Sequence, residues 1–269
     1  MKKLGFSFLI TFLISSLVLP AAFAHLRTYA FNQEYQTIPQ GSFEWEQWTT
    51  LSVPDGSKTR ENEWQYQSEL EYGITDHFTI ANYQRWKTIN VEGPDDSTIY
   101  EGFKFEGKYR IGERGKYWVD PLIYVEWKTD PREHEHHNEL ESKLILSKDF
   151  GKFNVVTNQI MENQLSRDGR TNYEFTIGAN YEVLSDFRVG VEMEGDYWRP
   201  SSHRNRIAMG PTLAWQGKYF WIVAGALFGV NHAADNHEVR LIVGLPLPFD
   251  TTQWFEKVST GTTTVGTPV

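Results

Sequence analysis

The chain contains no cysteine among its 269 residues. Neither disulfides nor lipid attached to a cysteine can therefore hold it in place. Long apolar runs are scarce as well, because no segment after residue 24 has the roughly 20 consecutive apolar residues of a transmembrane helix. The mean hydropathy of −0.49 is also too polar for a helical membrane protein. These absences exclude a disulfide-stapled domain and a bundle of membrane-spanning helices.

An excess of positive charge is missing too. The formal net charge is −9, and it becomes −11 if the two lysines at positions 2 and 3 are cleaved away. A nucleic-acid-binding protein favours a basic face, so we predict no nucleic-acid partner. Aromatic residues, in contrast, make up 15% of the chain. A β-barrel with a lipid-facing surface and a wet lumen combines this aromatic content with a polar average.

Residues 1–24 have the pattern of a secretory signal peptide. Two lysines precede an apolar run over residues 4–19, and the small-x-small cleavage signal AFA follows. An N-terminal membrane anchor is the alternative, but the run is short and ends at Pro20. We therefore expect the mature protein to begin at His25.

Large apolar residues alternate with polar ones in residues 173–183 (YEFTIGANYEV) and again, after the turn LSD, in residues 187–198 (FRVGVEMEGDYW). A period of two is the signature of a strand with one apolar face. If Val183 pairs with Phe187, both apolar sets lie on the same face. Each arm has about the 9 to 11 residues that cross a bilayer at a tilt. The pattern predicts a transmembrane hairpin with its apolar side toward lipid and its charged side toward a lumen.

Most of the remaining chain repeats this alternation. We predict twelve strands, over residues 43–53, 62–72, 78–89, 99–110, 117–128, 138–148, 153–162, 172–183, 187–198, 204–215, 218–230 and 237–249.

The connections alternate in length. Those after even-numbered strands are short, whereas those after odd-numbered strands are mostly longer and more polar. Bacterial outer-membrane barrels have this layout, and a soluble sandwich or lipocalin-like barrel has no reason for it. We predict an all-β protein with a single antiparallel up-and-down transmembrane β-barrel of about twelve strands over residues 42–249. Residues 25–41 are then a periplasmic N-terminal segment or a plug, and residues 250–269 a disordered periplasmic tail.

The alternation also predicts which charged residues line the lumen. They are Glu44, Glu46, Glu69, Glu71, Lys104, Glu106, Lys108, Arg110, Asp120, Glu126, Lys128, Glu139, Glu141, Lys143, Glu174, Glu182, Arg188, Glu192, Glu194, Asp196, Arg204, Arg206 and Arg240.

Such a mixed set suits a channel for polar or charged solutes. Alternatively, opposite charges pair across strands and close the interior, as Glu182 facing Arg188 would do. In the same register Glu174 faces Asp196, a like-charge pair that needs a cation or a shared proton between its members.

Six of the eight histidines fall in or beside the long loops. The run His134-Glu135-His136-His137 contains residue types that bind zinc or copper, so His134, His136 and His137 are candidate metal ligands. A solvated loop without metal is the alternative interpretation, because nothing in the sequence fixes their geometry.

Enzymatic barrels fit the sequence less well. An outer-membrane phospholipase needs a serine and a histidine together on strands, and no histidine lies in the middle of a predicted strand. A protease of the omptin type uses acidic residues and a histidine at the rim, which Asp95-Asp96 and Asp235-Asn236-His237 resemble only in residue type. A third alternative is a structural or adhesive barrel whose loops bind a partner.

Two phrases, IPQGSFEWEQW at residues 38–48 and LEYGITDHF at residues 70–78, resemble segments of bacterial outer-membrane barrels of the family named after the MetA pathway of phenol degradation. The last strand ends at Phe249 and resembles the signal that the barrel-assembly machinery reads. These resemblances imply a Gram-negative outer-membrane transporter without catalytic residues. We therefore predict a channel for small polar, charged or aromatic solutes, with outer-membrane lipid and the assembly machinery as partners and no cofactor.

Overall fold

The computed structural model describes residues 27–53, 62–90, 97–130, 137–166, 169–198, 205–231 and 237–251. The predicted signal peptide and most of the predicted tail lie outside these residues. Across the described part of the chain, no helix has the length and apolar character needed to cross a membrane.

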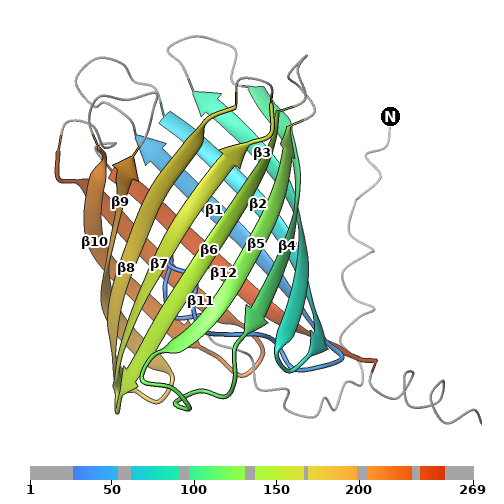
Figure 1. Cartoon of the computed structure of the whole chain (residues 1–269), viewed down its shortest axis with the longest axis vertical. Coiled ribbons are helices and arrows are strands. Elements are labelled where there is room, and N and C mark those ends of the chain that lie inside the picture. The colour runs from blue at the N-terminus through green and yellow to red at the C-terminus, as the bar shows by residue number, and fades with distance from the viewer. Residues whose placement is uncertain are drawn as a thin grey trace, which may run out of the picture.

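The described residues form twelve strands in one closed antiparallel barrel (Figure 1). Each strand pairs with its neighbours in sequence, and β1 pairs with β12 to close the barrel. The predicted fold class is confirmed. The bounds are β1 Ser42–Val53, β2 Asn62–Thr75, β3 Phe78–Asn90, β4 Ser97–Arg110, β5 Asp120–Asp130, β6 His137–Phe150, β7 Phe153–Gln164, β8 Thr171–Leu184, β9 Phe187–Trp198, β10 Ile207–Gln216, β11 Trp221–Gly229 and β12 His237–Asp250.

Alternating exposure divides each strand between two environments. On β8, Ile177 and Tyr181 are exposed on the outer surface, whereas Thr176 and Asn180 are buried in the interior. Other strands present exposed apolar side chains in the same way, among them Phe105, Ile123, Leu144, Val191, Met209, Leu213, Val239 and Leu241. An apolar outer surface of this kind is what lipid requires of a transmembrane barrel.

Three strands begin later than the sequence predicted. β5 begins at Asp120 instead of 117, because the Asp120 carboxylate accepts a hydrogen bond of 2.7 Å from Gly115 N and holds residues 111–119 in a turn. β11 begins at Trp221 instead of 218, after a turn in which Gly217 N donates to the Phe220 carbonyl at 2.8 Å. β10 begins at residue 207 instead of 204.

The predicted pair Val183–Phe187 is wrong. Leu184 pairs with Phe187, and the register shifts between Glu182 and Leu184. The extra residue lies at the end of the hairpin, so Glu182 still faces Arg188 as predicted.

Candidate functional site

The N-terminal segment, residues 27–41, lies inside the barrel, where its blue trace is visible in Figure 1. Its main anchor is Glu192 on β9, which is 1% exposed. The backbone N–H groups of Ala30, Phe31 and Asn32 donate to the Glu192 carboxylate at 2.7, 2.8 and 2.8 Å. Hydrogen bonds to an ionised acceptor are stronger than neutral ones. One carboxylate therefore holds three successive residues of the segment.

Asparagines on β7 hold the segment beside this anchor. Gln33 N donates to Asn158 Oδ1 at 2.8 Å, and Asn158 Nδ2 donates to the Gln33 carbonyl at 2.9 Å. The Tyr29 hydroxyl donates to Asn154 Oδ1 at 2.9 Å. Burial raises the pKa of Tyr29, so its hydroxyl remains a donor. These contacts satisfy buried polar groups that would otherwise have lost water.

Two apolar groups in the lumen receive the aromatic side chains of the segment. Tyr29 and Tyr35 pack with a group formed by Leu122, Tyr124, Ile145 and Val156. Ala30 and Phe31 belong to a second group that includes Trp48, Trp221, Val223, Leu227 and Ile242. The sequence prediction missed these lumen residues because it followed charged residues. Those on β1, β5, β6, β7 and β12 share the parity of the charged residues on their own strands, whereas β11 carries no charged residue.

Glycines in the lumen wall make room for the segment. A Cβ atom on Gly178 would lie 2.6 Å from Tyr29 Cε1, and one on Gly225 would lie 2.6 Å from Ala30 Cβ. Both distances are too short for real carbon atoms, so the segment fits only where the wall carries no side chain.

Two arginines pack on aromatic rings at this interface. Arg27 Nη1 lies 3.6 Å from Glu46 Oε2, and its guanidinium lies 4.3 Å from the Trp48 ring centroid. Although burial opposes the charge, the Glu46 carboxylate raises the pKa of Arg27. Arg240 of β12 lies 4.5 Å from the Phe31 ring centroid. These contacts combine cation–π attraction with a buried ion pair.

The segment leaves the lumen beside the turn between β2 and β3. Thr37 Oγ1 donates to the Asp76 carbonyl at 2.6 Å, and Gln40 N donates to Asp76 Oδ1 at 2.9 Å. Gly41 N then donates to the Gly73 carbonyl at 2.8 Å. The chain continues directly into β1, so the segment is joined to the wall that it contacts.

Along the strands from β1 to β7, the register aligns carboxylates in one row. We call it the carboxylate row. From β1 to β7, the successive paired positions are Glu44, Glu71, Ala81, Glu106, Glu126, Glu141 and Glu162. Like charges directly opposite one another destabilise a sheet unless cations lie between them.

Lysines beside the row supply these cations. Lys108 contacts Glu71 and lies 3.1 Å from Glu106, Lys104 lies 3.1 Å from Glu126, Lys143 lies 2.8 Å from Glu141, and Lys128 lies 3.7 Å from Glu162. Charges in this half of the lumen therefore pair across and along the strands.

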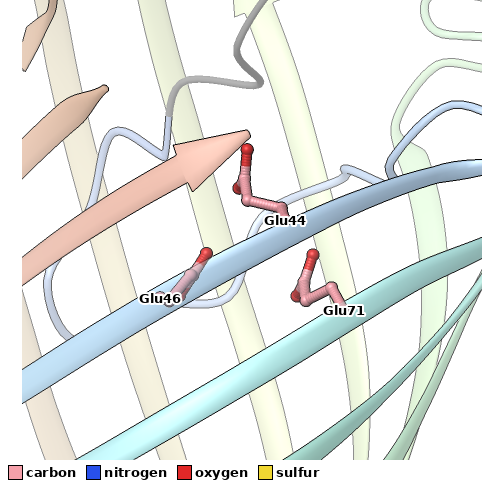
Figure 2. Close-up of side chains that lie close together, drawn as sticks. All are labelled: Glu44, Glu46 and Glu71. Atoms are coloured by element: carbon pink, nitrogen blue, oxygen red, sulfur yellow. The ribbon is translucent and has the colours of Figure 1, made fainter. Parts of the chain in front are cut away.

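Five carboxylates crowd together at the β1 end of the row. We call Glu44, Glu46, Glu69, Glu71 and Glu106 the acidic cluster, and their exposed fractions are 0 to 4%. Figure 2 shows that Glu44, Glu46 and Glu71 lie close together on neighbouring strands. Within the cluster, oxygens of Glu44, Glu46 and Glu71 lie within 4.8 Å of one another, and so do oxygens of Glu69, Glu71 and Glu106. Either set has the donor atoms for a hard metal ion.

A small cavity lies between the N-terminal segment and the acidic cluster. Its volume is about 30 Å³, and its lining includes Arg27 and Glu34 from the segment and Glu44, Glu46 and Lys108 from the wall. A cavity of this size holds about two water molecules.

Charges on β8 to β10 follow the predicted register. Arg188 Nη2 lies 2.8 Å from Glu182 Oε2, which confirms the predicted pair. Glu174 faces Asp196, as predicted. Arg206 N donates to Asp196 Oδ2 at 3.0 Å, and Arg206 Nε lies 3.9 Å from Asp196 Oδ1. Arg206 therefore provides the cation that this like-charge pair needs.

Most of the predicted lumen residues belong to the described part of the chain; Arg204 does not. None of those described is exposed. The sequence prediction missed four further carboxylates that make ion pairs, three of them with the parity of the lumen face and one, Glu101, turned inward at the register shift between Arg85 and Trp86. They are Glu63 with Lys87, Glu101 with Arg85, Glu162 with Lys128 and Glu238 with Arg240.

The candidate metal ligands of the histidine-rich loop are not placed. His134 and His136 lie outside the described residues, and so does the side chain of His137, whose backbone begins β6. Metal binding by this loop stays a prediction. The acidic residues Asp95, Asp96 and Asp235 also lie outside the described ranges.

The strands carry apolar side chains on the outer surface and polar side chains in the lumen, which is the architecture of a transmembrane β-barrel. Among solved structures, the chain is similar to an outer membrane channel from Pseudomonas putida F1, with a TM-score of 0.58 and 9% identity over 80% of this chain and 99% of that one. It is also similar to the NanC porin, with a TM-score of 0.50 and 14% identity over 76% of this chain and 100% of the porin. No family model and no curated protein sequence matches the chain. The shared feature is therefore the fold.

Proposed function

We propose that this chain is an outer-membrane channel for small polar, charged or aromatic solutes and that residues 27–41 act as its plug. The observation that carries the proposal is the cavity of about 30 Å³ between the N-terminal segment and the wall. That space is too small for a metabolite. Because the segment packs against β5 and β6 and lines this cavity together with Glu44 and Glu71, its removal frees room along the carboxylate row.

The carboxylate row supports a preference for cations or for solutes that carry both charges. Carboxylates outnumber lysines and arginines in the lumen, and charged rings of this kind select ions in channels. The lysines between the carboxylates offer contacts to an anionic group of the same solute. We therefore expect small charged molecules of mixed sign, or cations, to pass more readily than simple anions.

The same proposal includes the orientation of the chain in the outer membrane. The short turns after even-numbered strands support a periplasmic position for both termini. Residues 1–24 then serve as a cleaved signal peptide, and Phe249 precedes a periplasmic tail and is read by the barrel-assembly machinery. The exposed apolar side chains of the strands contact outer-membrane lipid.

A hydrolase on this barrel has less support. The histidines in the described part of the chain lie in a turn (His77) or at the first residue of a strand (His137 and His237). His77 Nε2 lies 2.9 Å from Glu113, which belongs to a neighbouring turn. A nucleophile would need its base held within a cleft, and these positions offer none.

Single-channel conductance in a planar bilayer tests the proposal. We compare the mature protein with a variant that lacks residues 25–38 and with a matched control that lacks residues 252–269. The mature protein and the control should conduct rarely, whereas the first deletion should give long openings. In a salt gradient, the sign of the reversal potential should then show that the open channel prefers cations to anions. Equal conductance in all three proteins, each with a β-rich circular dichroism spectrum, contradicts a plug.

A further inference from the structure

The acidic cluster carries more negative charge than its surroundings compensate. Its five carboxylates lie within a buried wall. Among the described residues, the cations in contact with them are Lys108, which pairs with Glu71 and Glu106, and Arg27, which pairs with Glu46. Burying an ionised carboxylate without a partner is costly, so this site favours the uptake of further positive charge.

Two buried oxygens of the cluster, Glu69 Oε1 and Glu106 Oε1, accept no hydrogen bond from the described residues, although Glu106 Oε1 lies 3.1 Å from Lys108 Nζ. Glu69 is 0% exposed; its Oε2 accepts a hydrogen bond from Trp48 Nε1 at 3.1 Å, but its Oε1 accepts none from the described part of the chain. Glu44, at 4% exposure, forms no ion pair within the described ranges. Glu44 lines the cavity and Glu69 lies beside it on the neighbouring strand. Because a buried carboxylate without a paired cation is costly, Glu44 indicates a small bound cation or a water molecule in that cavity.

The geometry suits one hard cation. Oxygens of Glu44, Glu46 and Glu71 lie within 4.8 Å of one another, which is about twice the Ca²⁺–oxygen distance of roughly 2.3 to 2.6 Å. One ion between them can therefore contact all three. Figure 2 shows the three side chains on two neighbouring strands, and the cavity of about 30 Å³ that they line leaves room for the ion and a water.

We propose that Glu44, Glu46 and Glu71 bind one divalent cation of the oxygen-preferring kind, best represented by Ca²⁺. Ca²⁺ accepts irregular sets of six to eight oxygens, whereas Mg²⁺ requires nearly ideal octahedral geometry and Zn²⁺ prefers nitrogen and sulfur. The site concerns binding alone and does not depend on conduction by the barrel. The ion shares the Glu46 carboxylate with Arg27 and so weakens the hold of the wall on the N-terminal segment.

Terbium luminescence tests the site on the refolded mature protein in detergent, because Tb³⁺ replaces Ca²⁺ and is sensitised by nearby indole rings. Trp48 Nε1 donates to Glu46 Oε2 at 2.9 Å, so its ring is within reach of the bound ion. We expect saturable emission that excess Ca²⁺ displaces. Glu44→Gln should weaken Tb³⁺ binding at least about tenfold. This variant breaks no ion pair, so the barrel should still fold.

Glu182→Gln, in the same lumen but paired with Arg188, serves as the matched control and should bind as the wild type does. Isothermal titration with Ca²⁺ gives a direct second readout, with one site expected per chain and its loss expected in Glu71→Gln. Equal titration curves for the wild type and Glu44→Gln, or no heat of binding at millimolar Ca²⁺, overturn the proposal.

Discussion

Asn32 donates two hydrogen bonds to the same oxygen of Glu192, one from its backbone N–H and one from its side-chain Nδ2, both at 2.8 Å. The two residues are 160 positions apart in the sequence. This contact joins the N-terminal segment to β9 through a charge on the wall, so changing that charge should loosen the segment without removing it.

Glu192→Gln should weaken the docking of the segment. The amide keeps an acceptor but loses the charge that strengthens the hydrogen bonds, which we expect to cost about 2 kcal/mol. That corresponds to a roughly 30-fold higher ratio of open to closed states in single-channel records. Glu194→Gln is the matched control, since Glu194 lies on the same face of β9 and pairs with Arg206 instead of the segment. Equal open probabilities for the two variants would falsify the role of Glu192.

Docking of the segment should also depend on pH through Glu34. Burial raises the pKa of Glu34 above its ordinary value of 4.5, although hydrogen bonds from Thr28 oppose the shift. A raised pKa means that the docked state favours the protonated acid. Its contribution is fully present below pH 4.5 and is lost as the pH rises through the raised pKa. Channel opening should therefore increase with pH over that window.

Glu34→Gln stays neutral at every pH and is the matched variant for this effect. Its open probability should vary less between pH 4 and pH 8 than that of the wild type. If both proteins respond identically to pH, another group controls the response.

Gly178→Val should expel the segment by steric conflict. A Cβ atom at this position meets Tyr29 at 2.6 Å, and valine adds two methyl groups in the same direction. Trypsin should then cleave after Arg27 in the folded barrel at least about tenfold faster than in the wild type, because the undocked segment exposes this bond. Gly107→Ala on the outer face meets only Phe78 at 3.5 Å, an ordinary contact, and should leave the cleavage rate unchanged. Protection of Arg27 in Gly178→Val would show that the segment tolerates the added side chain.

Lys108→Met should destabilise the barrel strongly. Lys108 pairs with two buried carboxylates, Glu71 and Glu106, and its loss leaves both without that cation. Breaking a buried pair in this way costs about 3 to 5 kcal/mol of the free energy of unfolding. Lys152→Met removes an exposed pair with Glu182 and should cost less than about 1 kcal/mol. Denaturant unfolding in detergent measures both, and similar midpoints would mean that the cluster does not depend on Lys108.

The strands and the lumen face could be predicted from the sequence because a period of two is a local signal. Glu182 and Arg188 illustrate this, since the tight turn between β8 and β9 brings them opposite each other. The carboxylate row was not predicted as a row, because it requires the register of seven strands at once. An error of one residue in any hairpin would break the row at that hairpin, and one between β6 and β7 would move Glu162 away from Glu141.

The docking of the N-terminal segment is the part that sequence reasoning left open. The contacts of Tyr29 with Asn154 and of Ala30 with Glu192 join positions more than a hundred residues apart. The local periodicity of a sequence carries no information about contacts between such distant positions. Apolar lumen residues such as Ile145 share the parity of the charged residues on their strand, but only the structure shows that they receive aromatic rings.

Because Gly41 hydrogen-bonds to Gly73 and the chain runs on into β1, the segment behaves as a ligand tethered to its own receptor. A short flexible tether gives an effective concentration in the millimolar range. Once displaced, the segment rebinds within its own molecule and never diffuses away. A free peptide of the same sequence would therefore have to reach millimolar concentration to compete, and closure of one barrel is independent of how many others surround it.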